Sequence, residues 1–78
     1  MRTARPTQVQ SFHTTAAAME TERVCAAEGL PGRLFPVPRQ LSSDCGIAWA
    51  ADPRDRVRLE ALAAAGAIEP AEIVELTI

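Results

Sequence analysis

A proline-flanked stretch in the middle of the chain, residues 36–46 (PVPRQLSSDCG), restricts the fold more than any other feature. Pro36 and Pro38 fix φ and donate no backbone hydrogen bond, so a strand that ends with them belongs at the edge of a sheet. Short apolar runs precede and follow the stretch. It therefore joins two strands through a loop from about Pro38 to Cys45, which is longer than the ~2–5 residues that a hairpin needs. The extra length favours a binding or chemical role.

Four segments of the sequence predict strands, at residues 7–12, 33–37, 46–50 and 72–78. The first is weakly patterned, because Gln8 and Gln10 interrupt its apolar residues. The last alternates strictly between apolar and polar residues, which is typical of a strand with one covered face, and we expect it at an edge of the sheet. Its apolar face consists of Val74, Leu76 and Ile78.

The first predicted helix follows the first strand. Thr14 or Thr15 can cap its start, and it runs to about Glu28, with Gly29 as a left-handed terminator. Small and apolar residues recur at helical spacing and predict the face that packs on the sheet. That face consists of Ala17, Ala18, Thr21, Val24 and Cys25.

The second predicted helix follows the third strand. Asp52 is a good N-cap and Pro53 suits the first helical position, so the helix begins there and runs to about Ala65. We expect an inner stripe of apolar residues along it, as in the first helix. The stripe consists of Val57, Ala61, Leu62 and Ala65.

The order βαββαβ predicts an α+β, ferredoxin-like two-layer sandwich, with a four-stranded antiparallel sheet and two helices on one face. In this topology the first and third strands are central and the other two are edges. The prolines then lie on an edge strand, where they are tolerated. We expect a single domain over residues 7–78, preceded by a disordered tail at residues 1–6.

Composition excludes several classes of function. The net charge is −2 and every positive side chain is an arginine, without the basic stripe that nucleic-acid binding needs. No apolar run approaches the ~20 residues of a membrane span, and no apolar segment follows the N-terminal arginines as in a signal peptide, so we expect a cytoplasmic protein with reduced cysteines. A structural zinc site needs four clustered ligands, so we expect no metal and no cofactor. With 78 residues the core is thin, which disfavours a self-contained enzyme and makes a homodimer plausible.

The central stretch resembles the signature of a selenium/sulfur carrier-like family, Pro-x-Pro-Arg-x-(Leu/Ile)-Ser-Ser-x-Cys-Gly. The family's preceding helix and turn match residues 18–22 (AMETE) and 29–30 (GL), so the resemblance covers about residues 12–49. It implies a small non-enzymatic carrier in which Cys45 bears a persulfide or selenopersulfide. The implied partner is a sulfur or selenium donor or acceptor, such as a cysteine desulfurase or sulfurtransferase. The resemblance also assigns a set of residues around the thiol, namely Arg39, Ser42, Ser43 and Gly46.

The residues themselves are compatible with this role. Gly46 can adopt positive φ and let a ligand approach the backbone, and a guanidinium such as that of Arg39 would raise the thiolate fraction of Cys45. Three alternatives stay open. Cys45 could be a small buried hydrophobe, residues 38–46 could form the docking surface of a non-catalytic interaction or ligand-sensing domain, or Cys25 and Cys45 could form a thiol redox switch.

The expected topology adds predictions about the surroundings of Cys45. We expect the start of the third strand to lie beside the C-terminal ends of both helices, whose partial negative charge disfavours a thiolate. Activation would then come from Arg39, from Arg33 and from loop amides. We expect His13 at the opposite end of the sheet, too far away to act as the base. Cys25 is expected at the same end as Cys45, mainly as a core residue.

Overall fold

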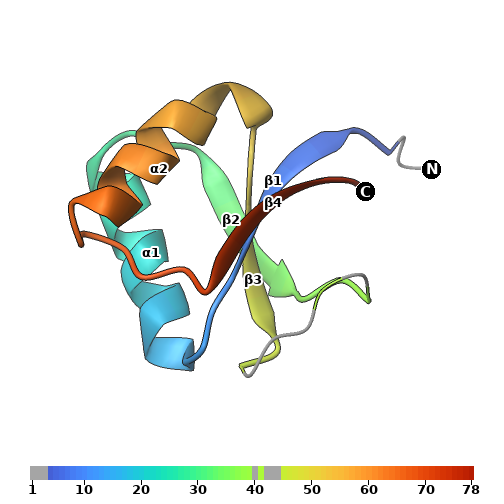
Figure 1. Ribbon diagram of the computed structural model, residues 1–78, viewed down its shortest axis with the longest axis horizontal. Helices are drawn as coiled ribbons and strands as arrows, with labels where there is room; N and C mark the ends of the chain where they lie inside the picture. The colour runs from blue at the N-terminus through green and yellow to red at the C-terminus, as the bar shows by residue number, and fades with distance from the viewer. Residues whose placement is uncertain (1–3, 40, 42–44) are drawn as a thin grey trace.

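The computed structural model describes residues 4–39, 41 and 45–78 and has the predicted order of elements (Figure 1). The strands are β1 (Pro6–Ser11), β2 (Gly32–Pro36), β3 (Ile47–Ala51) and β4 (Glu72–Thr77). The helices are α1 (Thr15–Ala27), the short 3₁₀ helix η1 (Pro53–Asp55) and α2 (Arg56–Ala64). Each boundary lies within a few residues of its prediction. The expected disordered tail covered residues 1–6. Within it, the backbone of Arg5 pairs with that of Ile78, and Pro6 is the first residue of β1.

The four strands form one antiparallel sheet in the order β2-β3-β1-β4, and α1 and α2 cover the same face of it (Figure 1). This is the expected ferredoxin-like sandwich. Pro36 is the last residue of β2, which is an edge strand as the prolines required. No helix in the described part of the chain is long and apolar enough to cross a membrane.

The strand register defines two ends of the sheet. At one end β1 finishes and β3 begins, with Ser11 opposite Ala48. We call this the thiol end, because Cys45 lies just before β3. At the other end β3 finishes at Ala51, which is opposite both Gln8 and Gly32. We call this the arginine end, after three arginines described below.

Helix α1 starts at the thiol end. The Thr14 hydroxyl accepts a hydrogen bond from the Ala17 amide at 3.1 Å and so caps the helix, as predicted. Ala18, Thr21 and Cys25 are buried, in agreement with the expected inner face. The helix ends in a turn at Gly29, whose φ of 70° is the expected left-handed conformation.

Helix α2 is preceded by η1, a first turn of 3₁₀ type, where the Asp52 carboxylate accepts a hydrogen bond from the Arg54 amide at 2.9 Å. The predicted inner stripe of α2 is confirmed for Leu62 and wrong for Val57, Ala61 and Ala65, which are exposed. Leu59 is completely buried, whereas Val57 is 76% exposed. Leu59 and Leu62 are three residues apart and therefore share a face, so the two leucines, rather than Val57, pack toward the core.

The core lies between the sheet and the helices and includes Phe12, Trp49 and Leu59. The two glutamines that weakened the first strand pattern belong to this side of the central strand β1. Gln8 is opposite Ala51 and Gln10 is opposite Trp49, and both glutamines are buried. The Gln8 side-chain amide donates to the Glu75 carboxylate at 3.1 Å. A central strand with two inward polar residues explains why periodicity alone was a weak signal.

Candidate functional site

The loop between β2 and β3 leaves the sheet at the thiol end and is closed at its base. The Val37 amide donates to the Gly46 carbonyl at 3.1 Å, and farther out the Leu41 amide donates to the Pro38 carbonyl at 3.0 Å. Gly46 has a φ of 73°, as the sequence predicted, and a Cβ there would meet nothing within 4 Å. The backbone next to Cys45 therefore has room around it.

Cys45 is partly buried and packs against the core cluster. Its Sγ donates a hydrogen bond to the Ile47 carbonyl at 3.3 Å. This bond needs the thiol proton, so any chemistry that replaces the proton breaks it. The side chain thus combines a packed position with partial access to solvent.

The sequence analysis assigned four residues to the surroundings of Cys45, and the structure describes two of them, Arg39 and Gly46. Arg39 is exposed and forms no hydrogen bond or ion pair with the other described residues, and Gly46 directly follows the cysteine. Ser42 and Ser43 lie outside the described residues. The role of these four residues around Cys45 therefore remains a prediction.

We expected the C-terminal ends of both helices at the thiol end, and this expectation is wrong for α1. The first turn of α1 lies there, and the residues after α2 pack beside it, because Thr14 and Ala17 share a cavity of about 410 Å³ with Gly66 and Ala67. Figure 1 shows the start of α1 near the start of β3. The reason is that β1 and β3 are antiparallel, so the helix that follows β1 begins where β3 begins. One positive and one negative helix end therefore lie at the thiol end.

The predicted place of His13 is also wrong. Because β1 ends with Ser11 opposite Ala48, the segment that follows β1 and the segment that precedes β3 leave the sheet at the same end. His13, which is exposed, therefore lies at the thiol end together with Cys45. The geometric argument against a role for His13 does not hold. The sequence contained the signal, since antiparallel pairing of the first and third strands implies this placement.

Cys25 lies at the arginine end, contrary to expectation. It is completely buried and lines a cavity of about 390 Å³ with Leu30, Gly32 and Trp49. Burial raises the pKa of its thiol, and the nearby Asp55 and Glu28 carboxylates raise the pKa further. Neither cysteine forms a disulfide.

A direct bridge between the two cysteines does not suit this arrangement. Cys45 precedes β3 at the thiol end, whereas Cys25 lies beside Leu30, Gly32 and Trp49 toward the arginine end. A disulfide needs Cα atoms within ~7 Å of each other. A Cys25–Cys45 redox switch would therefore require a large movement of the backbone.

Arg33 is likewise remote from Cys45. It is opposite Ala50, near the arginine end, and its guanidinium stacks on the Phe35 ring with 5.5 Å to the centroid. Ala50 alternates with the inward-facing Trp49, so Arg33 projects from the sheet face away from the helices. The expectation that Arg33 helps to activate the thiol is therefore wrong. Within the described ranges, no group of three or more His, Cys, Asp or Glu side chains could hold a metal ion.

Comparison with known proteins gives one informative match. The family model described as "Putative Se/S carrier protein-like" matches residues 9–75, which is most of the chain and includes every strand and helix described above at least in part. The comparisons found no similar curated protein and no similar solved structure.

Proposed function

The chain belongs to the Se/S carrier protein-like family, and from this premise we propose that it carries sulfur or selenium on Cys45. The observation that carries the proposal is the place of this thiol, half-buried at the base of a closed loop with the unobstructed Gly46 beside it. A carrier needs a thiol that a partner can reach and that the fold still holds in position. The buried Cys25 does not meet the first condition.

The transfer step can be written in full. The Cys45 thiol gives its proton to solvent, and the thiolate attacks the terminal atom of a donor persulfide R–S–SH or selenopersulfide R–S–SeH. A bond forms between Cys45 Sγ and that atom, the bond from that atom to the donor sulfur breaks, and the donor leaves as R–S⁻. The chain then holds Cys45–S–SH or Cys45–S–SeH, without any net oxidant. The same displacement by an acceptor thiolate returns Cys45 to its starting form.

Two features of the thiol end support this step. The start of α1 brings the positive end of one helix dipole to this end of the sheet, where it offsets the negative end of α2 that lies there as well. Arg39, Ser42, Ser43 and Gly46 are proposed to surround the carried atom, through a guanidinium, two hydroxyls and a backbone amide. The reaction also breaks the 3.3 Å bond from Sγ to the Ile47 carbonyl, which costs part of its favourable free energy.

The partner implied by this chemistry is a protein that mobilises sulfur or selenium, such as a cysteine desulfurase or a sulfurtransferase. Because the domain is small, we propose that it acts as a non-enzymatic accessory in the cytoplasm and that the partner supplies the catalytic site. A long loop that joins two strands at the end of a sheet suits such an encounter.

The test is sulfur loading followed by intact-mass spectrometry. The full chain is incubated with a cysteine desulfurase and L-cysteine, and we expect a gain of one sulfur atom that a reductant removes. Cys45→Ser should abolish the gain, whereas Cys25→Ala should retain it. Peptide mapping should place the added sulfur on Cys45.

Loading of both cysteines, or loading that survives Cys45→Ser, would contradict the proposal. If the wild-type chain gains no sulfur but still binds the desulfurase, and if substitutions at Val37 and Leu41 weaken that binding, the loop is instead a docking surface. That outcome would replace the carrier function by the interaction function considered from the sequence.

A further inference from the structure

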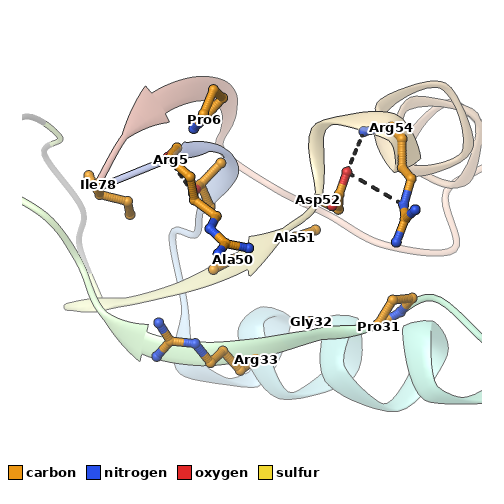
Figure 2. A pocket seen from close by; sticks show the side chains of 11 residues that line it. Arg5, Pro6, Pro31, Gly32, Arg33, Ala50, Ala51, Asp52, Arg54 and Ile78 are labelled. Carbon is orange, nitrogen blue, oxygen red and sulfur yellow. Dashed lines mark hydrogen bonds and ion pairs between the residues drawn. The ribbon is translucent and has the colours of Figure 1, made fainter. Parts of the chain in front are cut away.

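A second candidate site lies at the arginine end, away from Cys45. A cavity of about 640 Å³ opens between the tips of β1 and β4 on one side and the start of β2 on the other, with η1 at its flank (Figure 2). We call it the arginine pocket, and its main lining residues are Arg5, Pro6, Pro31, Arg33, Ala51 and Arg54. Small-molecule sites usually have volumes of ~300–1,000 Å³, so the pocket can hold a ligand as large as a mononucleotide.

The charge of the pocket differs from that of the molecule. Three arginines and one acidic side chain, that of Asp52, line it, which gives the lining side chains a net charge of +2. The chain as a whole has a net charge of −2. Arginines from three separate segments are therefore concentrated in one cavity of an acidic protein, and such a concentration of cations in a concave site attracts an anion.

Two of the three guanidinium groups have no carboxylate partner among the described residues. Arg54 lies 3.6 Å from the Asp52 carboxylate, while Arg33 contacts the Phe35 ring and Arg5 makes no ion pair within the described chain. Figure 2 shows the side chain of Arg5 extending from the β1 side toward Ala50, while that of Arg33 runs along β2 and points away from Arg54. The backbone of Arg5 pairs with that of Ile78 through two hydrogen bonds of 3.0 and 3.1 Å, and Arg33 pairs with Ala50 in the sheet.

From this arrangement we propose that the arginine pocket binds a phosphorylated small molecule, a function separate from chalcogen transfer at Cys45. Guanidinium groups bind phosphate through paired N–H donors, and donors from different directions suit the tetrahedral arrangement of its oxygens better than a planar carboxylate. Pro6, Pro31 and Ala51 offer apolar walls for the organic part of the ligand. The absence of a basic stripe on the chain favours a small anion over a nucleic acid.

The experiment uses the full chain and follows backbone amide shifts by NMR during titration with adenosine 5′-monophosphate, adenosine and succinate. We expect saturable shifts at Gly32, Arg33, Ala51 and Arg54 with the monophosphate, and binding at least tenfold weaker for adenosine and for succinate. Arg5→Gln and Arg33→Gln should each weaken binding of the monophosphate roughly ten- to hundredfold, since hydrogen bonds to charged groups are strong.

Arg56→Gln is the matched control. It removes the same charge from an exposed arginine on α2 that pairs with Glu60 and does not line the pocket, so binding should be unchanged. Cys45→Ser should also leave binding unchanged, which separates this proposal from the carrier function. Equal weakening by Arg56→Gln, equal affinity for adenosine or succinate, or no saturable shift with the monophosphate would each overturn the proposal. Thermal unfolding of each variant verifies that the fold persists.

Discussion

The thiol end and the arginine end of the sheet are built from the same four strands but are suited to different chemistry. At the thiol end, a long loop meets β3 and places the Cys45 sulfur at the edge of the core. At the arginine end, Arg5 ahead of β1, Arg33 in β2 and Arg54 in η1 line one cavity, and the second sulfur, that of Cys25, is buried beside Trp49 and Leu30. The two ends also differ in the length of their connections, since residues 37–46 join β2 to β3 at the thiol end, whereas only residues 28–31 join α1 to β2 at the arginine end. A longer connection leaves more backbone outside the sheet, where binding groups are commonly found.

The largest expected difference between the ends concerns their glycines. A Cβ on Gly32 would lie 2.5 Å from the Trp49 ring and 2.6 Å from the Ala50 carbonyl, whereas a Cβ on Gly46 would meet nothing within 4 Å. Gly32→Ala should therefore reduce the free energy of unfolding by about 3 kcal/mol, through overpacking. Gly46→Ala should cost about 1 kcal/mol, because its φ of 73° strains any side chain. Urea unfolding measures both, and equal costs would show that the two ends are packed alike.

A second difference between the ends is the response of the cysteines to pH. The folded-state pKa of Cys25 is raised, so its neutral thiol stabilises the fold below the unfolded value of ~8.5, and this stability is lost as the pH rises through the folded-state pKa. The chain has no Lys and no Tyr, so cysteines are the only side chains that titrate between about pH 8 and 11. The free energy of unfolding should fall over this range.

Substitution of each cysteine shows which of the two causes this decrease in the free energy of unfolding at alkaline pH. Cys25→Ala should flatten the dependence of the unfolding free energy on pH, and Cys45→Ser should leave the decline in place. Chemical unfolding at several pH values supplies the slopes. If Cys45→Ser flattened the profile instead, the thiol end would be the more enclosed of the two.

A third and smaller effect comes from the two N-caps, which lie at opposite ends. Thr14→Ala at the thiol end and Asp52→Ala at the arginine end should each cost about 1 kcal/mol in unfolding free energy. Only Asp52→Ala should tighten binding of adenosine 5′-monophosphate, because it removes the one acidic side chain from the arginine pocket. NMR titration of the two variants tests this, and tighter binding by Thr14→Ala would show that the ends are coupled.

The smallest expected effect concerns Arg39. Its guanidinium is exposed and makes no ion pair with the other described residues, so we expect only a weak effect on Cys45 that solvent screens. Arg39→Gln should slow alkylation of Cys45 by iodoacetamide less than about fivefold, corresponding to less than 1 kcal/mol. Arg33→Gln is the control and should not change the rate. A much larger effect of Arg39→Gln would indicate a direct contact with the thiolate during the reaction.

Local patterns predicted a large part of this molecule. Pro36 placed β2 at an edge, the caps at Thr14 and Asp52 are formed as expected, and Gly46 has the positive φ that its place before β3 suggested. These features depend on steric limits and hydrogen bonds within a few residues, so the local sequence is enough to predict them. The inner face of α2 was wrong except for Leu62, because its apolar residues are mostly alanines and give little indication of which side packs.

The sequence by itself therefore determined the elements and their order, and it led to the proposal that Cys45 carries a chalcogen. Only the tertiary structure decided which residues share an end of the sheet. It places His13 at the same end of the sheet as Cys45, and it places Cys25 and Arg33 toward the other end. It also forms the arginine pocket from segments that are far apart in the chain. The physical reason is that proximity at a sheet end depends on strand direction and register, which are set by pairing across the whole domain and not by any local stretch of residues.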